Sequence, residues 1–268
     1  MAKAKNALSR DYKVVKHNDL IQKSRYELSM QEQKIILYLI TKIKPEDDEF
    51  EEYEFNIKDF CEVCGINTSG KNYTDLKDTI LNLVKKAFWL KLEDESIITA
   101  RWIDRSQIIE NSGIIKIKLD ELMRPYLLKL KEHFTAYNLY YTLAMKSKYS
   151  IRFYELLKSY ENLSEYTVEI EELKKMLFAE KYELFGDLKR NVLDTAVREI
   201  NDYSDISVAY TVEKEGRKVN KIHFKIKPKK DEKERMETFK KIENILNPNQ
   251  VQGQLNLFEN QKGENEYG

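Results

Sequence analysis

Cysteine is nearly absent from the sequence, and its two examples lie close together. Cys61 and Cys64 have no second Cys or His pair at the spacing of a zinc site. Two neighbouring thiols cannot build a disulfide framework, and this scarcity suits the reducing cytoplasm. We therefore expect two small buried side chains on one helix face of a cytoplasmic protein, with no metal site and no cofactor.

Long apolar runs are also missing. No stretch approaches the roughly 20 apolar residues that a membrane-spanning helix needs, and residues 1–17 lack the apolar segment of a secretory signal. The three histidines, His17, His133 and His223, are isolated from one another along the chain. No histidine pair can hold a metal beside a nucleophilic tyrosine, so the tyrosines are predicted to pack and stack. We find no catalytic residues and predict that the protein is not an enzyme; a nicking enzyme or relaxase is the competing possibility.

The net charge is zero, because 46 basic residues balance 46 acidic ones, but the charges are segregated. Residues 1–25 hold seven bases against two acids, residues 44–54 hold seven acids against one base, and residues 214–230 contain Glu215 as their only acid. Clusters of one sign create local potentials that a neutral total conceals. This distribution favours phosphate binding by the basic segments; the alternative is solvated charge with no partner.

A sequence pattern occurs twice, 112 positions apart. Residues 75–88 (DLKDTILNLVKKAF) and 187–200 (DLKRNVLDTAVREI) both begin with Asp-Leu-Lys. Their shared apolar positions are Leu76, Ile80, Leu81 and Val84 in the first copy, and Leu188, Val192, Leu193 and Ala196 in the second. Each copy follows a short strand and a short helix, and strand-like segments come after it. This order is typical of a winged helix, so we predict an α+β fold of two tandem winged-helix domains with a disordered C-terminal tail.

Four regions are predicted from composition and periodicity. They are a basic flexible arm (1–25), an N-terminal winged-helix domain (26–137), a C-terminal winged-helix domain (138–230) and a flexible tail (231–268). Within them we expect helices at 24–43, 58–64, 73–88, 139–160, 171–178 and 185–201, single strands at 53–57 and 166–170, a three-stranded sheet over 89–119, and a final hairpin of strands 206–213 and 219–227. Ser29 and Glu32 have the spacing of a capping box.

The helix predicted at 185–201 has an apolar back and a polar front. At 100° per residue, one side carries the apolar residues, while the other carries residues able to reach base edges: Arg190, Asn191, Asp194, Thr195 and Arg198. Arginine pairs well with guanine and asparagine with adenine in the major groove. The hairpin that follows supplies Arg217, Lys218 and Lys221 as a wing. An ordinary amphipathic surface helix is the competing interpretation.

The matching helix at 73–88 is less basic, because Asp78 stands where the second copy has Arg190. We expect this domain to hold phosphates rather than to read bases. Its predicted DNA contacts are Thr79, Asn82, Lys85, Lys86, Arg101 and Arg105.

The tail contains a short apolar motif in a polar setting, formed by Gln254, Leu255, Leu257 and Phe258. An apolar run with no core to join favours a partner groove. The motif resembles the peptide by which bacterial replication proteins engage the sliding clamp.

Two long segments carry a resemblance to a known family. Residues 14–40 (VVKHNDLIQKSRYELSMQEQKIILYLI) and 139–160 (LYYTLAMKSKYSIRFYELLKSY) resemble plasmid replication initiators of the Rep_3 (RepB-type) iteron-binding family. The similarity covers roughly residues 12–228, and Lys146–Leu157 is its most specific part. The resemblance implies two winged helices that bind directly repeated origin DNA, theta-type initiation by monomers, and dimers that regulate copy number. It also implies that the N-terminal domain carries the dimer interface.

The expected function is therefore initiation of plasmid replication at directly repeated origin DNA. Dimers are expected to be autoregulatory. The expected partners are duplex DNA with direct repeats, a second copy of the chain, and host replication proteins, namely the sliding clamp, the host initiator and the replicative helicase. A winged-helix transcriptional regulator that binds operator DNA is the alternative.

Overall fold

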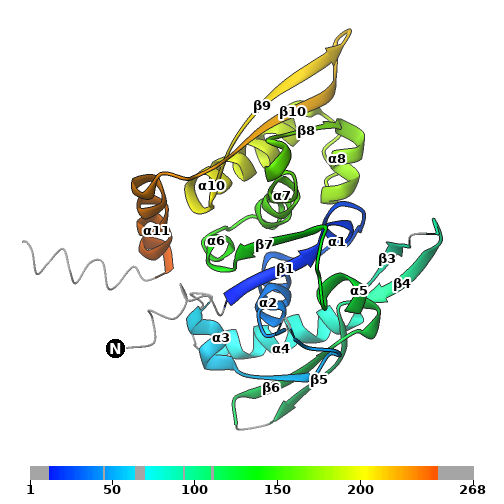
Figure 1. The fold of residues 1–268 in the computed structure, drawn as a ribbon, viewed down its shortest axis with the longest axis vertical. Helices are drawn as coiled ribbons and strands as arrows, with labels where there is room; N and C mark the ends of the chain where they lie inside the picture. Colours follow the sequence, from blue (N-terminus) through cyan, green and yellow to red (C-terminus); the bar gives the residue numbers. More distant parts are fainter. Residues whose placement is uncertain (1–11, 45, 64–69, 93, 110–111, 247–268) are drawn as a thin grey trace, which may run out of the picture.

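The computed structural model describes residues 12–44, 46–63, 70–92, 94–109 and 112–246. Within these ranges the chain forms two winged helices, one above the other in Figure 1, joined by a central layer. None of the described helices has the length and apolar composition that a membrane span requires.

The C-terminal winged helix follows the expected order of elements. It consists of β8 (Glu165–Glu169), α8 (Ile170–Leu177), α9 (Phe185–Leu188), a π-helical turn (Lys189–Leu193), α10 (Asp194–Tyr203), β9 (Ile206–Glu215) and β10 (Lys218–Pro228). Its antiparallel sheet has the order β8-β10-β9. The β9–β10 hairpin extends beyond the body of the domain as the wing (Figure 1).

The N-terminal winged helix repeats this topology. It consists of β2 (Glu52–Asn56), α3 (Ile57–Val63), α4 (Gly70–Lys85), β5 (Ile103–Ile109) and β6 (Ile114–Leu119), with the sheet order β2-β6-β5. A separate hairpin of β3 (Ala87–Lys91) and β4 (Ile97–Arg101) is inserted after α4. The duplication inferred from the two Asp-Leu-Lys segments is therefore confirmed as two winged helices.

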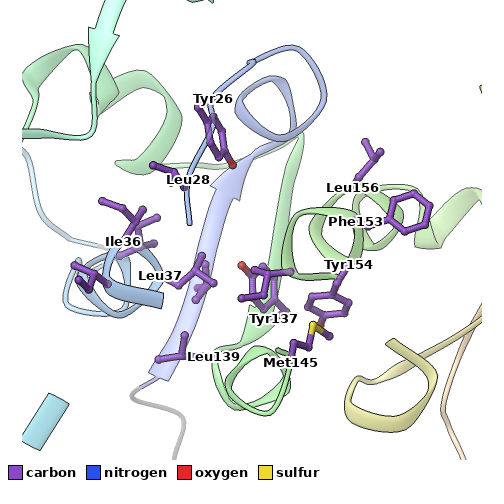
Figure 2. Close-up of a cluster of buried hydrophobic side chains, with 14 of the residues drawn as sticks. Tyr26, Leu28, Ile36, Leu37, Tyr137, Leu139, Met145, Phe153, Tyr154 and Leu156 are labelled. Atoms are coloured by element: carbon purple, nitrogen blue, oxygen red, sulfur yellow. The ribbon is translucent and has the colours of Figure 1, made fainter. Parts of the chain in front are cut away.

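The central layer is a pair of antiparallel strands between two helices. β1 (Lys13–His17) pairs with β7 (Phe134–Asn138). Figure 2 shows Ile36 and Leu37 of α2 (Met30–Ile40) on one side of the pair, and Phe153 and Tyr154 of α7 (Lys148–Ser159) on the other. The remaining elements are α1 (Asn18–Gln22), α5 (Arg124–Leu127), α6 (Tyr140–Leu143), α11 (Glu232–Leu246) and two short 3-10 turns, Glu121–Met123 and Glu161–Leu163.

The capping box predicted at the start of α2 is confirmed. The backbone N–H of Glu32 donates to the Ser29 hydroxyl at 3.2 Å, and the Ser29 N–H donates to the Glu32 carboxylate at 2.6 Å. These bonds satisfy donors that the helix start leaves without intrahelical partners. Since the box fixes the first turn, α2 begins at Met30 rather than at the predicted residue 24.

The prediction that residues 1–25 form a flexible arm is wrong for its second half. Val14, Leu20 and Ile21 are fully buried, and β1 and α1 belong to the core. The basic residues misled the prediction because Lys16 is only 2% exposed and is paired inside the protein. Residues 1–11 lie outside the described parts of the chain.

The predicted three-stranded sheet over 89–119 is divided between two sheets. β4 pairs with β3, whereas β5 pairs with β6. The division falls at Trp102, which is fully buried and packs against Tyr26 and Phe88 at ring-centroid distances of 5.0 and 5.5 Å. Alternating polarity alone does not reveal this change of sheet.

The predicted helix 139–160 is two helices, α6 and α7. Ser147 caps α7 by accepting the N–H of Tyr149 at 3.2 Å. The Glu199 carboxylate accepts the backbone N–H groups of Lys146 and Ser147, each at 3.2 Å. These polar contacts fix a new helix start where the apolar pattern runs on.

The predicted flexible tail begins too early. α11 packs against α6 and α10, with Ile242 fully buried and Phe239 stacked on Tyr141 at 5.9 Å. The Tyr140 hydroxyl also donates to Glu243 at 2.5 Å. Residues 247–268, including the clamp-like motif, lie outside the described parts of the chain.

Candidate nucleic-acid interface

The helix predicted to read bases is backed by the core as expected. Leu188, Val192, Leu193, Ala196 and Ile200 are all fully buried. The π-helical turn Lys189–Leu193 makes this possible, because one extra residue in the turn lets the adjacent Val192 and Leu193 both face inward. Beyond the turn, the buried residues are Ala196 and Ile200. Each lies one residue later along the chain than regular α-helical spacing from Leu188 would place it.

α4 has no such turn, and one predicted core position there is wrong. Leu76 and Ile80 are buried as expected, but Leu81 is 51% exposed and Leu83 is fully buried in its place. Regular α-helical spacing carries the apolar face from residue 76 to 80 and 83. The two repeated segments are therefore alike in sequence but differ in helical register after their second turn.

The outer face of the C-terminal helix carries the predicted polar residues. Arg190, Asn191, Asp194 and Arg198 are exposed, and Thr195 is half-buried. The Arg190 guanidinium donates to Asp187 at 2.7 Å, and the Asn191 amide donates to the Asp187 carbonyl at 2.9 Å. Within the described chain, Arg198 has no hydrogen-bond or ion-pair partner. This face therefore presents two guanidinium groups and an amide to solvent.

Asp194 connects the helix to the wing. One of its carboxylate oxygens accepts from Lys189 and the other from the Tyr210 hydroxyl of β9, each at 2.6 Å. Burial raises the pKa of Asp194, but the two hydrogen bonds outweigh it, and the pKa lies below its ordinary value. The carboxylate is therefore charged and fixed in orientation at neutral pH.

Lys189, Asp187 and Tyr210 were not among the predicted site residues. The Asp187 and Arg190 pair has the i, i+3 spacing of a helical ion pair, so the sequence contained a signal for it. Tyr210 lies 16 residues after Asp194, on another element, and only the tertiary structure brings the two together.

The wing places basic side chains at its tip. Gly216 adopts a left-handed conformation with φ of 62°, which lets the chain reverse between Glu215 and Lys218. Arg217 and Lys218 are exposed, whereas Lys221 lies lower on β10, 3.9 Å from Glu213. A groove of about 700 Å³ separates the wing from the N-terminal ends of α8 and α9. Its lining includes Lys174, Leu184, Lys214, Arg217 and Lys218.

The predicted contacts of the N-terminal domain are less uniform. Asn82 and Lys85 are exposed on α4, and Thr79 donates its hydroxyl to the Asp75 carbonyl at 2.6 Å. Lys86 is held inward by the Glu32 carboxylate at 2.6 Å and by the Glu27 carbonyl at 3.2 Å.

Arg101 and Arg105 belong to different sheets, and each has an acidic neighbour. Arg101 lies 3.7 Å from Asp120, and Arg105 lies 3.2 Å from Glu52. The structure therefore gathers the predicted residues of the C-terminal domain around one helix and its wing, but distributes those of the N-terminal domain over several elements.

A helix that presents two arginines and an asparagine to solvent, is backed by the core and is flanked by a basic hairpin occurs in a fold of two successive winged helices. This fold defines the chain as a tandem winged-helix protein. Family models give the particular family. The model described as "Initiator Replication protein, WH1" matches residues 13–158, and the model described as "Initiator Rep protein, WH2" matches residues 169–226. The chain belongs to this family of initiator replication proteins.

The chain is also similar to individual proteins. The chain is 31% identical to the PI protein of Escherichia coli over 159 residues, which cover 52% of the chain and about half, 51%, of that relative. It is 21% identical to an uncharacterized 27.6 kDa protein of Escherichia coli over 225 residues, which cover 78% of the chain and 93% of the relative. Among solved structures, domains 2 and 3 of RctB have 14% identity and a TM-score of 0.46, covering 80% of this chain and 82% of that one.

Proposed function

We propose that the protein initiates plasmid replication by binding directly repeated origin DNA, the iterons, through both winged helices. Membership of the initiator family supports this function. The observation that carries it is the exposed face of residues 189–198, which holds Arg190, Asn191 and Arg198 against a fully buried apolar back. Such a face fits a major groove, where arginine and asparagine distinguish bases.

Each group in the interface then has a distinct role. Arg190, Asn191 and Arg198 read base edges, and Asp194 accepts a hydrogen bond from a cytosine amino group. Thr195, whose hydroxyl donates to the Arg190 carbonyl at 3.3 Å, supports the helix backbone. Arg217, Lys218 and Lys221 neutralise phosphates beside the groove. In the N-terminal domain, Asn82 and Lys85 offer exposed phosphate contacts, while Thr79, Lys86, Arg101 and Arg105 contribute after exchanging their present partners.

Binding of several copies then deforms the origin and helps to open the adjacent duplex for theta-type replication. The chain itself supplies binding energy and needs no catalytic step. Dimers formed through the N-terminal domain regulate the protein's own synthesis and the copy number. Gln254, Leu255, Leu257 and Phe258 recruit the sliding clamp, and the host initiator and replicative helicase act on the opened strand.

Binding to DNA selected from a random duplex library by the full chain tests the proposal. We expect the selected duplex to bind about a thousandfold or more tightly than scrambled DNA at physiological salt. The logarithm of affinity should fall linearly with the logarithm of salt concentration, and Lys218→Ala should reduce that slope by about one. Failure of the chain to enrich any sequence would contradict the proposal.

A plasmid maintenance assay distinguishes an initiator from a regulator. A plasmid that carries the selected repeats and no other origin should replicate only when the protein is supplied. Deleting residues 250–268 should leave repeat binding intact and abolish binding to purified sliding clamp. Unchanged clamp affinity in that deletion would remove the tail from the proposal.

A further inference from the structure

One edge of α7 carries polar side chains at regular intervals. Lys148, Arg152, Glu155 and Ser159 are separated by four, three and four residues, so they lie in a line along the helix axis. We refer to these four residues as the seam. The opposite side of α7 belongs to the C-terminal domain, where Phe153 packs on Phe224 at 5.1 Å.

Every seam residue contacts the segment that runs from β1 to α2. The Lys148 ammonium pairs with Glu27 at 2.7 Å, and Glu155 pairs with Lys16 at 2.6 Å. Ser159 accepts a hydrogen bond from the Gln22 amide at 3.0 Å.

Arg152 makes the most extensive contact of the four. Its guanidinium donates to the carbonyls of Ile21 and Ser24 at 2.6 and 3.0 Å and lies over the Tyr26 ring at 4.6 Å. The side chain is buried, and it closes the C-terminal end of α1.

The seam is part of a continuous path between the two DNA-facing helices. On the C-terminal side, Glu199 of α10 accepts the backbone N–H groups at the start of α7. On the N-terminal side, Glu32 of α2 pairs with Lys86, which directly follows α4. The seam therefore lies on one route of contacts that connects α10 with α4.

We propose that the seam sets the spacing between the two DNA segments that one chain binds. This inference rests on the proposed function. Hydrogen bonds and ion pairs are directional, whereas an apolar contact of the same area permits sliding. One base pair inserted between the segments moves them apart by about 3.4 Å and rotates them by about 35°. Bonds of 2.6–3.0 Å along the seam cannot absorb such a displacement.

The test uses a duplex selected by the full chain and the same duplex with one base pair inserted. Hydroxyl-radical footprinting of the wild-type complex locates the two protected segments, and the insertion is placed between them. Arg152→Met removes the central seam contact. Lys148→Met is the milder variant, because this side chain is 30% exposed and its loss leaves the core intact. Lys158→Met is the matched control, since it makes the same change on the same helix but its partners Glu161 and Asp205 belong to the C-terminal side.

For the wild type and for Lys158→Met, we expect the insertion to weaken binding about tenfold or more. For Arg152→Met and Lys148→Met, the insertion should reduce affinity by a clearly smaller factor. The DNA segment bound by the N-terminal domain should then be weakly protected, while the segment bound by the C-terminal domain stays well protected. The seam proposal is overturned if both seam variants keep the wild-type penalty, or if the wild type tolerates the insertion. A wild type that enriches no sequence would instead overturn the proposed function.

Discussion

Replacing Lys16 by Met should destabilise the fold strongly. Lys16 and Glu155 form an ion pair of 2.6 Å in which both side chains are 2% exposed. The variant leaves the Glu155 carboxylate buried without its counter-charge, although the Tyr137 hydroxyl still donates to it at 2.6 Å. Breaking one side of a buried pair costs about 3–5 kcal/mol. For a chain of this size, the melting temperature should fall by about 6–20 °C.

A second variant distinguishes the contribution of the charges to stability from the contribution of the packing around them. Lys16→Met combined with Glu155→Gln removes both charges, and the glutamine carbonyl still accepts the Tyr137 hydroxyl. We expect this double variant to recover most of the lost stability, because a neutral buried pair needs no counter-charge. The coupling energy from the double-mutant cycle should exceed about 1 kcal/mol.

Urea unfolding followed by tryptophan fluorescence measures both variants, since Trp102 lies beside Lys16 with its ring centroid 5.3 Å from the ammonium nitrogen. Lys23→Met is the control, because its pair with Asp19 is at the surface and should contribute less than about 0.5 kcal/mol. A Lys16→Met protein within about 1 kcal/mol of the wild type would refute the reasoning.

Three further predictions concern other parts of the chain. Leu83→Ala should cost about 2–5 kcal/mol in urea unfolding, whereas Leu81→Ala should cost less than about 1 kcal/mol; equal losses would contradict the register of α4. Tyr210→Phe should raise the pKa of Asp194 toward its ordinary value in a carboxyl NMR titration, and an unchanged pKa would exclude the hydrogen bond as a cause. Because the folded pKa of Asp194 is lowered, its stabilising effect is present above the unfolded pKa and is lost as the pH falls through the folded value. Phe239→Ala should accelerate amide hydrogen exchange in residues 232–246 and leave the rest of the chain unchanged. If the exchange rates of residues 232–246 stay at the wild-type level, the ring does not hold α11.

Much of the fold could be predicted because the local signals agree with one another. Ser29 and Glu32 mark the start of α2, and they form the predicted box. Apolar periodicity places the long helices, and the repeated Asp-Leu-Lys segments identify two related domains. The exposed face with Arg190 and Arg198 follows from the same periodicity, because a helix with one buried side must present its other residues to solvent.

The features that could not be predicted depend on tertiary contacts. Leu81 is exposed on the regular α-helix α4, whereas its counterpart Leu193 is buried at a π-helical turn that the sequence pattern did not reveal. Lys16 belongs to a segment with the composition of a flexible basic arm, but Glu155, 139 residues later, pairs with it in the core. Trp102 divides two sheets that share one alternating pattern. For Lys16 and Trp102 the deciding partners, Glu155 and Tyr26, are distant in sequence, so local propensity gives no information about them.

The central claim is that the helix from Phe185 to Tyr203 reads bases through Arg190 and Arg198. The most direct measurement compares the affinity of the Arg190→Ala, Arg198→Ala double variant for a selected duplex and for scrambled DNA, at one salt concentration. We predict that affinity for the selected duplex falls to the level of the scrambled one, while affinity for scrambled DNA changes far less. An equal loss on both duplexes would contradict base reading and leave the two arginines as phosphate contacts.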